Sequence, residues 1–154
     1  MSQTSASKTL RAFVFALPLI CAAPALVQAH GDGAPQPIDT TGLEPLGEEA
    51  RTKNPYEGNA KAIEIGASGY NKNCARCHGL EAKSGGMAPD LRELEKGESV
   101  DTFFLTRVQG GAQRDGRYRM PPFGEILNQE AIWAIRTYIE SEAQKDPALA
   151  AKVN

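Results

Sequence analysis

Residues 74–78 read Cys74-Ala75-Arg76-Cys77-His78, and this short stretch decides the fold more than any other part of the chain. Two thiols at this spacing can form thioether bonds with both vinyl groups of one haem. The histidine that follows directly can present its imidazole to the iron from the same side. Cys-x-x-Cys-His is the attachment pattern for c-type haem. The stretch therefore predicts one covalent haem, anchored by Cys74 and Cys77, with His78 as an iron ligand.

Three other uses of these residues fit the rest of the chain less well. A zinc site needs about four nitrogen or sulfur ligands, and beyond the motif residues 30–154 offer only His30 and carboxylates. A redox-active dithiol normally opens a helix that follows a strand, whereas this motif ends a helical pattern. A structural disulfide would leave His78 without a role.

The spacing of apolar residues predicts three helices. The first starts after Asn59, its N-cap, and runs into the motif. A short second helix is expected from a Ser99 cap to Gly110-Gly111, and a third from its Asn128 cap to Pro147. The apolar positions that define the first and last helices are Ile63, Gly66, Ala67, Tyr70 and Cys74, and then Ile132, Ile135 and Ile139.

The remaining stretches, 79–97 and 116–124, are rich in glycine and proline and are expected to be loops. The sequence has no strand-like alternation and no internal repeat. Three helices and long loops predict an all-α domain whose helical faces alone would form a thin core. A large apolar cofactor would supply the missing centre.

The first 29 residues have the pattern of a secretory signal peptide. Lys8 and Arg11 precede an apolar run from residue 12 to 27, and Val27-Gln28-Ala29 has the small residues that a signal peptidase reads. Two prolines interrupt the run, which is too short for a spanning helix. We expect cleavage near Ala29 and export to the periplasm of a Gram-negative bacterium, with no membrane span in the mature chain. An uncleaved anchor is the alternative.

The mature chain is then divided into an extended Pro/Gly-rich arm at 30–59, a haem domain at 60–146 and a tail at 147–154. Residues 1–29 contain two basic and no acidic residues, so their removal takes the formal net charge from −2 to −4. An acidic chain is a poor match for nucleic acid, which is bound by basic surfaces. We expect a monomer.

The second axial ligand of the iron must come from His30, Met87 or Met120. Met87 follows His78 by only nine residues, a tight reach around a haem, and we expect it to pack instead. Met120 is 42 residues beyond His78 and precedes two prolines that restrict the backbone, so Met120 is favoured. A His/Met pair raises the potential relative to two histidines and leaves no open position on the iron. That ligation predicts electron transfer rather than catalysis.

Together these residues resemble the class I cytochromes c, whose fold is a few helices around one haem. The pattern Gly66-x-x-x-Tyr70-x-x-x-Cys74-x-x-Cys77-His78 is similar to the first helix and haem motif of that family. Tyr138 is similar to the aromatic residue of its last helix, which crosses the first at the glycine. The resemblance implies that Pro89 accepts a hydrogen bond from His78 and that Met120 is the distal ligand.

Residues 54–59, 68–82 and 131–140 also resemble periplasmic cytochromes c that accept electrons from PQQ-dependent (quinoprotein) alcohol dehydrogenases. This resemblance implies a soluble monohaem electron carrier, not an enzyme, that passes electrons toward a terminal oxidase. Two alternatives stay open. One is a haem subunit of a multi-subunit periplasmic dehydrogenase, and the other is a haem enzyme or gas sensor with an open iron site.

Overall fold

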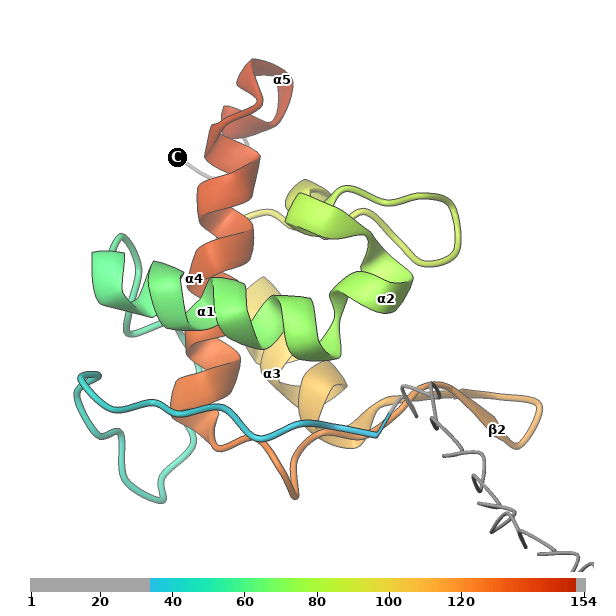
Figure 1. Ribbon diagram of the computed structural model, residues 1–154, viewed down its shortest axis with the longest axis horizontal. Helices are drawn as coiled ribbons and strands as arrows, with labels where there is room; N and C mark the ends of the chain where they lie inside the picture. The colour runs from blue at the N-terminus through green and yellow to red at the C-terminus, as the bar shows by residue number, and fades with distance from the viewer. Residues whose placement is uncertain (1–33, 152–154) are drawn as a thin grey trace, which may run out of the picture. The chain divides into compact units, whose positions relative to one another are not determined.

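The computed structural model describes residues 34–151, which are mostly helical (Figure 1). The predicted signal peptide and His30 lie outside the described residues. None of the helices between residues 34 and 151 has the length and apolarity that a membrane crossing requires. In chain order the elements are α1 (Ala60–Asn73), α2 (Ala75–His78), the 3₁₀ turns η1 (Leu80–Ala82) and η2 (Leu91–Glu93), α3 (Glu98–Gly110), β1 (Ala112–Arg114), β2 (Arg117–Met120), α4 (Gln129–Gln144) and α5 (Pro147–Ala150).

The first helix, α1, begins where the sequence predicts. The Asn59 side chain accepts hydrogen bonds from the second and third helical amides, which have no partner inside the helix. Its buried face is rotated slightly from the expected one, because Ile65 is buried while Ile63 is half-buried. Gly69 lies on the same face, and a Cβ there would be 2.4 Å from Cδ1 of Ile38. The segment before α1 therefore covers a side of α1 that the apolar pattern predicts to face solvent.

The central packing of the molecule is the crossing of α1 over α4, which Figure 1 shows at the middle of both helices. A Cβ on Gly66 would lie 1.9 Å from the carbonyl oxygen of Ala134, so only glycine fits at this crossing. The rings of Tyr70 and Tyr138 pack beside it, with centroids 5.3 Å apart. The expected close crossing at Gly66 is confirmed.

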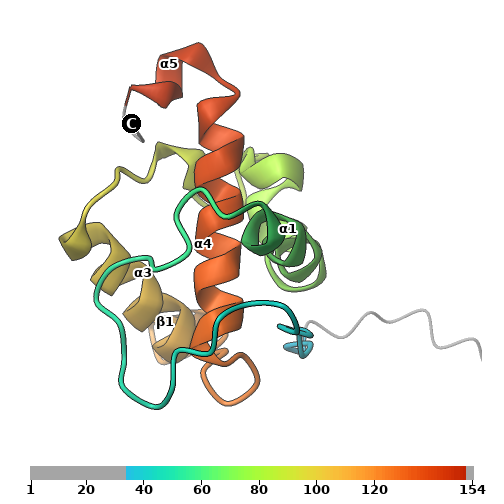
Figure 2. The same ribbon diagram turned by 90° about the vertical axis from the view of Figure 1, so that its left-hand side faces the viewer.

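The last long helix, α4, is buried on nearly all sides instead of along a single isoleucine stripe. Trp133 is as inaccessible as Ile132. The cause is residues 34–59, which have no helix or strand but run across α3 and α4 (Figure 2). Leu43 and Leu46 of this segment are buried in the core. Apolar periodicity could not predict the extra burial, because it comes from a segment distant in the sequence.

A buried polar network ties this segment to α3 and α4. Arg136 Nε lies 3.0 Å from Oδ1 of Asp101 and 3.2 Å from Oε1 of Glu140. The Asn54 amide nitrogen donates to the Thr137 hydroxyl at 3.0 Å, and the Asn54 backbone N–H donates to Asp101 at 2.9 Å. All five residues are buried. Since buried charges are tolerated only when they are paired and hydrogen-bonded, this network fixes the segment in one position.

Two local predictions for the stretch after α2 are wrong. Helix α3 begins at Glu98 after a Gly97 cap, not after Ser99. The expected loop at 116–124 begins as a β-hairpin, in which β1 pairs antiparallel with β2. Its two turn residues, Asp115 and Gly116, have φ angles of 53° and 71°, as the tightest hairpin turns require. Residues 34–151 are therefore all-α, as expected, except for one small two-stranded sheet.

Candidate haem site

Cys74 is the C-cap of α1, and the other four residues of the Cys-x-x-Cys-His motif form the single turn of α2. The backbone amides of Cys77 and His78 both donate to the Cys74 carbonyl oxygen, at 3.1 Å and 3.0 Å. Cys74 is half-buried, Cys77 is exposed, and both are free thiols. His78 is half-buried. The turn therefore brings two thiols and an imidazole together at the edge of the core.

The imidazole of His78 is held by a backbone carbonyl. Its Nδ1 lies 2.9 Å from the carbonyl oxygen of Pro89. A carbonyl oxygen can only accept, so Nδ1 must carry the hydrogen in this bond. The lone pair of the neutral ring is then on Nε2, which is the tautomer a metal-binding histidine needs.

The loop that carries Pro89 is itself braced on both sides. Ser84 donates its hydroxyl hydrogen to the Ala88 carbonyl oxygen, and its backbone N–H donates to Asp90 at 3.3 Å. The guanidinium of Arg92 lies 2.8 Å from the Asp90 carboxylate. This hydrogen-bonded pair lowers the pKa of Asp90, so the brace is charged at neutral pH. The Pro89 carbonyl is thus held in place by its neighbours.

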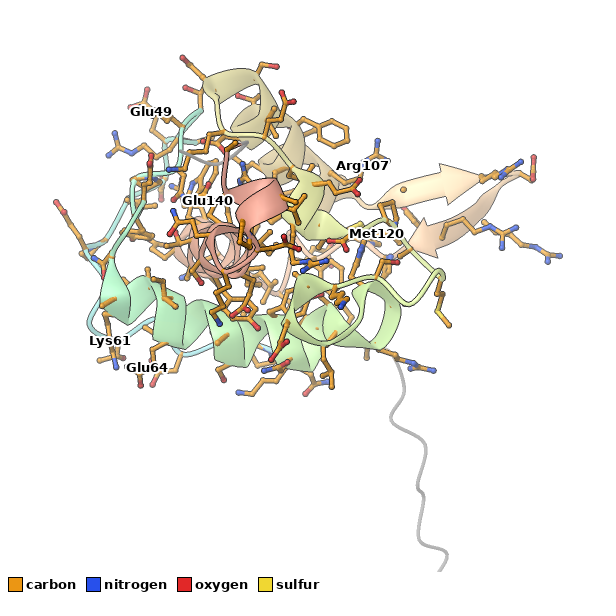
Figure 3. The ribbon with its side chains drawn as sticks, turned by 90° about the horizontal axis from the view of Figure 1, so that it is seen from above. Glu49, Lys61, Glu64, Arg107, Met120 and Glu140 are labelled. Atoms are coloured by element: carbon orange, nitrogen blue, oxygen red, sulfur yellow. The ribbon has the colours of Figure 1, made fainter. Side chains whose placement is uncertain are left out.

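Met120 is the last residue of β2 and is half-buried against the hydrophobic core. The chain around it is tightly packed, because a Cβ on Gly111 would lie 2.5 Å from the Met120 carbonyl oxygen. Figure 3 shows Met120 at the root of the hairpin. Met87 is different: it is 76% exposed, so the expectation that it packs is wrong. Met87 follows Gly85 and Gly86 in a bend between η1 and η2.

The alternative uses of the cysteines are not favoured by the local chemistry. Burial raises the pKa of the Cys74 thiol to about 12, whereas a redox-active dithiol needs an easily formed thiolate. For zinc, no group of three His, Cys, Asp or Glu side chains clusters as metal ligands within residues 34–151. Cys74, Cys77 and His78 instead fit a haem, which forms thioether bonds with two cysteines and takes a nitrogen ligand on its iron.

The margin of the core carries thiol, thioether and aliphatic side chains, which we call the apolar rim. The partly buried apolar residues packed against the core include Cys74, Ala75, Leu91, Leu94 and Met120. They come from the motif, from η2 and its C-cap, and from the end of β2, so a thiol and a thioether pack against the same hydrophobic core. Haem is a large apolar ring that requires this combination, and the residues present fit it. The Leu91 and Leu94 contributions were missed because residues 79–97 read as loop, although their spacing of three was the available signal.

Comparison with known proteins identifies relatives of this chain. The family model described as cytochrome C oxidase, cbb3-type, subunit III matches residues 61–139, from α1 to near the end of α4. Cytochrome c550 of Pseudomonas aeruginosa is 60% identical over 120 residues, which is 75% of this chain and 83% of that protein.

Two further relatives are larger or more distant. Quinohemoprotein alcohol dehydrogenase ADH-IIG of Pseudomonas putida is 38% identical over 82 residues, which are 53% of this chain but only 11% of that enzyme. The crystal structure of cytochrome cL from Methylophaga aminisulfidivorans MPT aligns with a TM-score of 0.47 and 21% identity, and covers 76% of this chain and 85% of that one.

The matched family range includes the Cys-x-x-Cys-His motif, and the identity to cytochrome c550 is extensive. Haem c is the covalently bound cofactor of such proteins, and their function is to transfer electrons. The chain belongs to the cytochrome c family and is a haem-binding electron-transfer protein, not an enzyme.

Proposed function

We propose that this protein is a periplasmic monohaem carrier that accepts electrons from a quinoprotein alcohol dehydrogenase and passes them toward a terminal oxidase. In this proposal Cys74 and Cys77 hold the haem, and His78 and Met120 are its axial ligands. Pro89 orients His78. Residues 1–29 are the signal peptide, cleaved near Ala29, and the mature chain acts as a monomer.

The bond between His78 Nδ1 and the Pro89 carbonyl oxygen carries the proposal. It leaves Nε2 as the only ring donor for iron, and Met120 supplies a soft thioether at the same apolar rim. When bound, haem c supplies a one-electron redox couple. With both axial positions filled by the protein, no site remains for oxygen or peroxide, which favours outer-sphere electron transfer over catalysis.

The choice of partner is supported by the relatives. A segment of this chain is similar to part of a quinohemoprotein alcohol dehydrogenase, an enzyme named for both a quinone and a haem. A second such enzyme from Pseudomonas putida, ADH IIB, is 29% identical over 96 residues. An alcohol dehydrogenase that has no haem of its own would need a separate haem protein to accept its electrons. This chain suits that role because it is similar to a segment of enzymes that are named for a haem.

The test is to mix the purified protein, oxidised, with a purified PQQ-dependent alcohol dehydrogenase and ethanol, and to follow the haem α-band by stopped flow. We expect reduction within the turnover time of the dehydrogenase, with one electron taken up per chain. Cytochrome reduction no faster than with heat-inactivated dehydrogenase would refute this partner. Stoichiometric co-purification with a dehydrogenase through gel filtration would indicate a permanent subunit instead.

A further inference from the structure

The basic residues of this chain are unevenly distributed. The segment 107–119 has four arginines and a single acidic residue, a formal charge of +3, in a chain whose total is −2. The remainder of the chain therefore carries −5. All four arginines are exposed. Three belong to the hairpin, which projects away from the helices in Figures 1 and 3. We call the exposed residues Arg114, Arg117, Tyr118 and Arg119 the basic hairpin.

The arginines of the basic hairpin are not placed there to stabilise it. Arg114 and Arg117 are direct cross-strand partners, and like charges opposite each other destabilise a strand pair. Their one ion pair is weak: Arg114 Nε lies 3.8 Å from Asp115, and both side chains are at least 80% exposed. Within residues 34–151, Arg117 and Arg119 have no ion pair. Because these arginines lower the stability of the strand pair, we expect them to have a function other than stabilising the fold.

Protection of the sheet edges does not explain the pattern. Exposed strands are commonly protected from aggregation by charged side chains, but either sign of charge serves that purpose. Alternating lysine and glutamate would do so without the repulsion between Arg114 and Arg117. The bulge in the pairing leaves Arg119 without a partner residue, which turns one more arginine outward next to Met120.

The basic hairpin leads directly into the apolar rim at Met120. Strand β2 ends at Met120. The backbone of Gly111, just before β1, packs closely against the Met120 carbonyl, so the two ends of the hairpin are held together. The chain after Met120 is bonded to α3, since the Phe123 amide donates to the Val108 carbonyl oxygen at 2.9 Å. Arg107, which stacks on Phe103 at 5.1 Å, extends the positive charge onto α3. A molecule bound to the hairpin would therefore lie beside the proposed distal ligand.

The side chains indicate what kind of molecule that is. Arginine forms paired hydrogen bonds with carboxylates, and exposed arginine and tyrosine are the residue types enriched at protein interfaces. Tyr118 is 54% exposed between two arginines. We propose that the basic hairpin is the docking surface for a carboxylate-rich face of the redox protein that exchanges electrons with this chain. This inference rests on the proposed electron-carrier function and adds the site and the charge of the partner.

The first test measures whether the hairpin attracts anions to the haem. Three proteins are compared: the wild type, the triple variant R114Q/R117Q/R119Q, and a control K53Q/K61Q/K145Q that loses the same charge elsewhere. Hexacyanoferrate(III) takes one electron from each reduced protein and becomes hexacyanoferrate(II), while the haem iron becomes ferric. At low ionic strength we expect the hairpin variant to react about tenfold more slowly than the control. The difference should vanish at roughly 0.5 M salt.

The second test is a binding measurement without electron transfer. Titration calorimetry with polyglutamate, a mimic of an acidic protein face, should give weaker binding for the hairpin variant than for the control. An unchanged α-band will show that the variant is folded. If both variants lose rate and affinity equally, only net charge matters and the proposal fails. It also fails if the hairpin variant differs only in binding to phosphatidylglycerol vesicles, since the surface would then be a membrane site.

The same variants separate this inference from the proposed partner. If a quinoprotein alcohol dehydrogenase reduces the wild type, its rate should fall with R114Q/R117Q/R119Q and not with the control. If it does not reduce the wild type at any salt concentration, the proposed partner is wrong. The hexacyanoferrate and polyglutamate results then still decide the role of the basic hairpin.

Discussion

Met120 and Met87 have the same side chain but very different surroundings. Met120 is half-buried at the core margin, and the backbone around it is in close contact with Gly111. Met87 is 76% exposed in the bend between η1 and η2. Sequence spacing alone favours Met120 as the ligand, and the structure adds that Met120 packs against the core whereas Met87 does not.

The first residue-scale prediction concerns this difference. Met120→Ala should make the ferric haem high-spin or water-ligated, and should lower the reduction potential by on the order of 0.2 V, a fraction of the range that axial ligands span. Met87→Ala is the matched control and should change neither property. Absorption spectra and a redox titration measure both. If Met87→Ala changed the spin state and the potential and Met120→Ala did not, Met87 would be the ligand.

A second residue-scale prediction concerns the helix crossing. A Cβ at Gly66 would meet the Ala134 carbonyl oxygen at 1.9 Å, so α1 and α4 must separate to accept it. We expect Gly66→Ala to lower the free energy of unfolding by about 1–3 kcal/mol, the usual cost of overpacking, or more. Gly85→Ala, where nothing lies within 4 Å, should have little effect. Equal denaturant midpoints for the two variants would show that the crossing tolerates a methyl group.

At the scale of elements, the sequence predicts the long helices well and their surroundings poorly. Caps at Asn59 and Asn128 are local signals, and both are found as predicted. The hairpin was missed although Asp115-Gly116 is a strong turn signal, because its strands are short and carry arginines instead of alternating apolar residues. The burial of Trp133 and Arg136 could not be predicted, since it depends on a segment that has no periodicity.

The network that joins this segment to α3 and α4 gives an element-scale prediction. Burial raises the pKa of Glu140 above its ordinary value of 4.5. The folded chain then holds this proton to higher pH than the unfolded chain. The contribution of Glu140 to stability is therefore greatest below that value and falls as the pH rises.

Glu140→Gln removes this titration while it keeps the size of the side chain. Relative to the wild type, the free energy of unfolding of the variant should rise as the pH increases above 4.5. Urea unfolding across this range measures the difference. Glu64→Gln, whose side chain is 72% exposed on α1, controls for the loss of a carboxylate. A difference that is constant with pH would mean that Glu140 is not destabilised by burial.

At the scale of the whole molecule, the site is assembled from segments that are distant in the sequence. The motif gave Cys74, Cys77 and His78 as candidates directly, because their chemistry depends on local spacing. Pro89 came only from a family resemblance, and the structure adds its contact with His78. The apolar rim and the basic hairpin depend on tertiary packing, which no local pattern contains.

The most direct test of the account is whether the haem is covalently attached through Cys74 and Cys77. The purified exported protein is denatured, extracted with acid acetone and weighed by intact-protein mass spectrometry. We predict a chain beginning at His30 that retains the mass of one haem, and a Cys74→Ala, Cys77→Ala variant that has lost it. Haem that passes into the acetone from the wild-type protein would contradict the account.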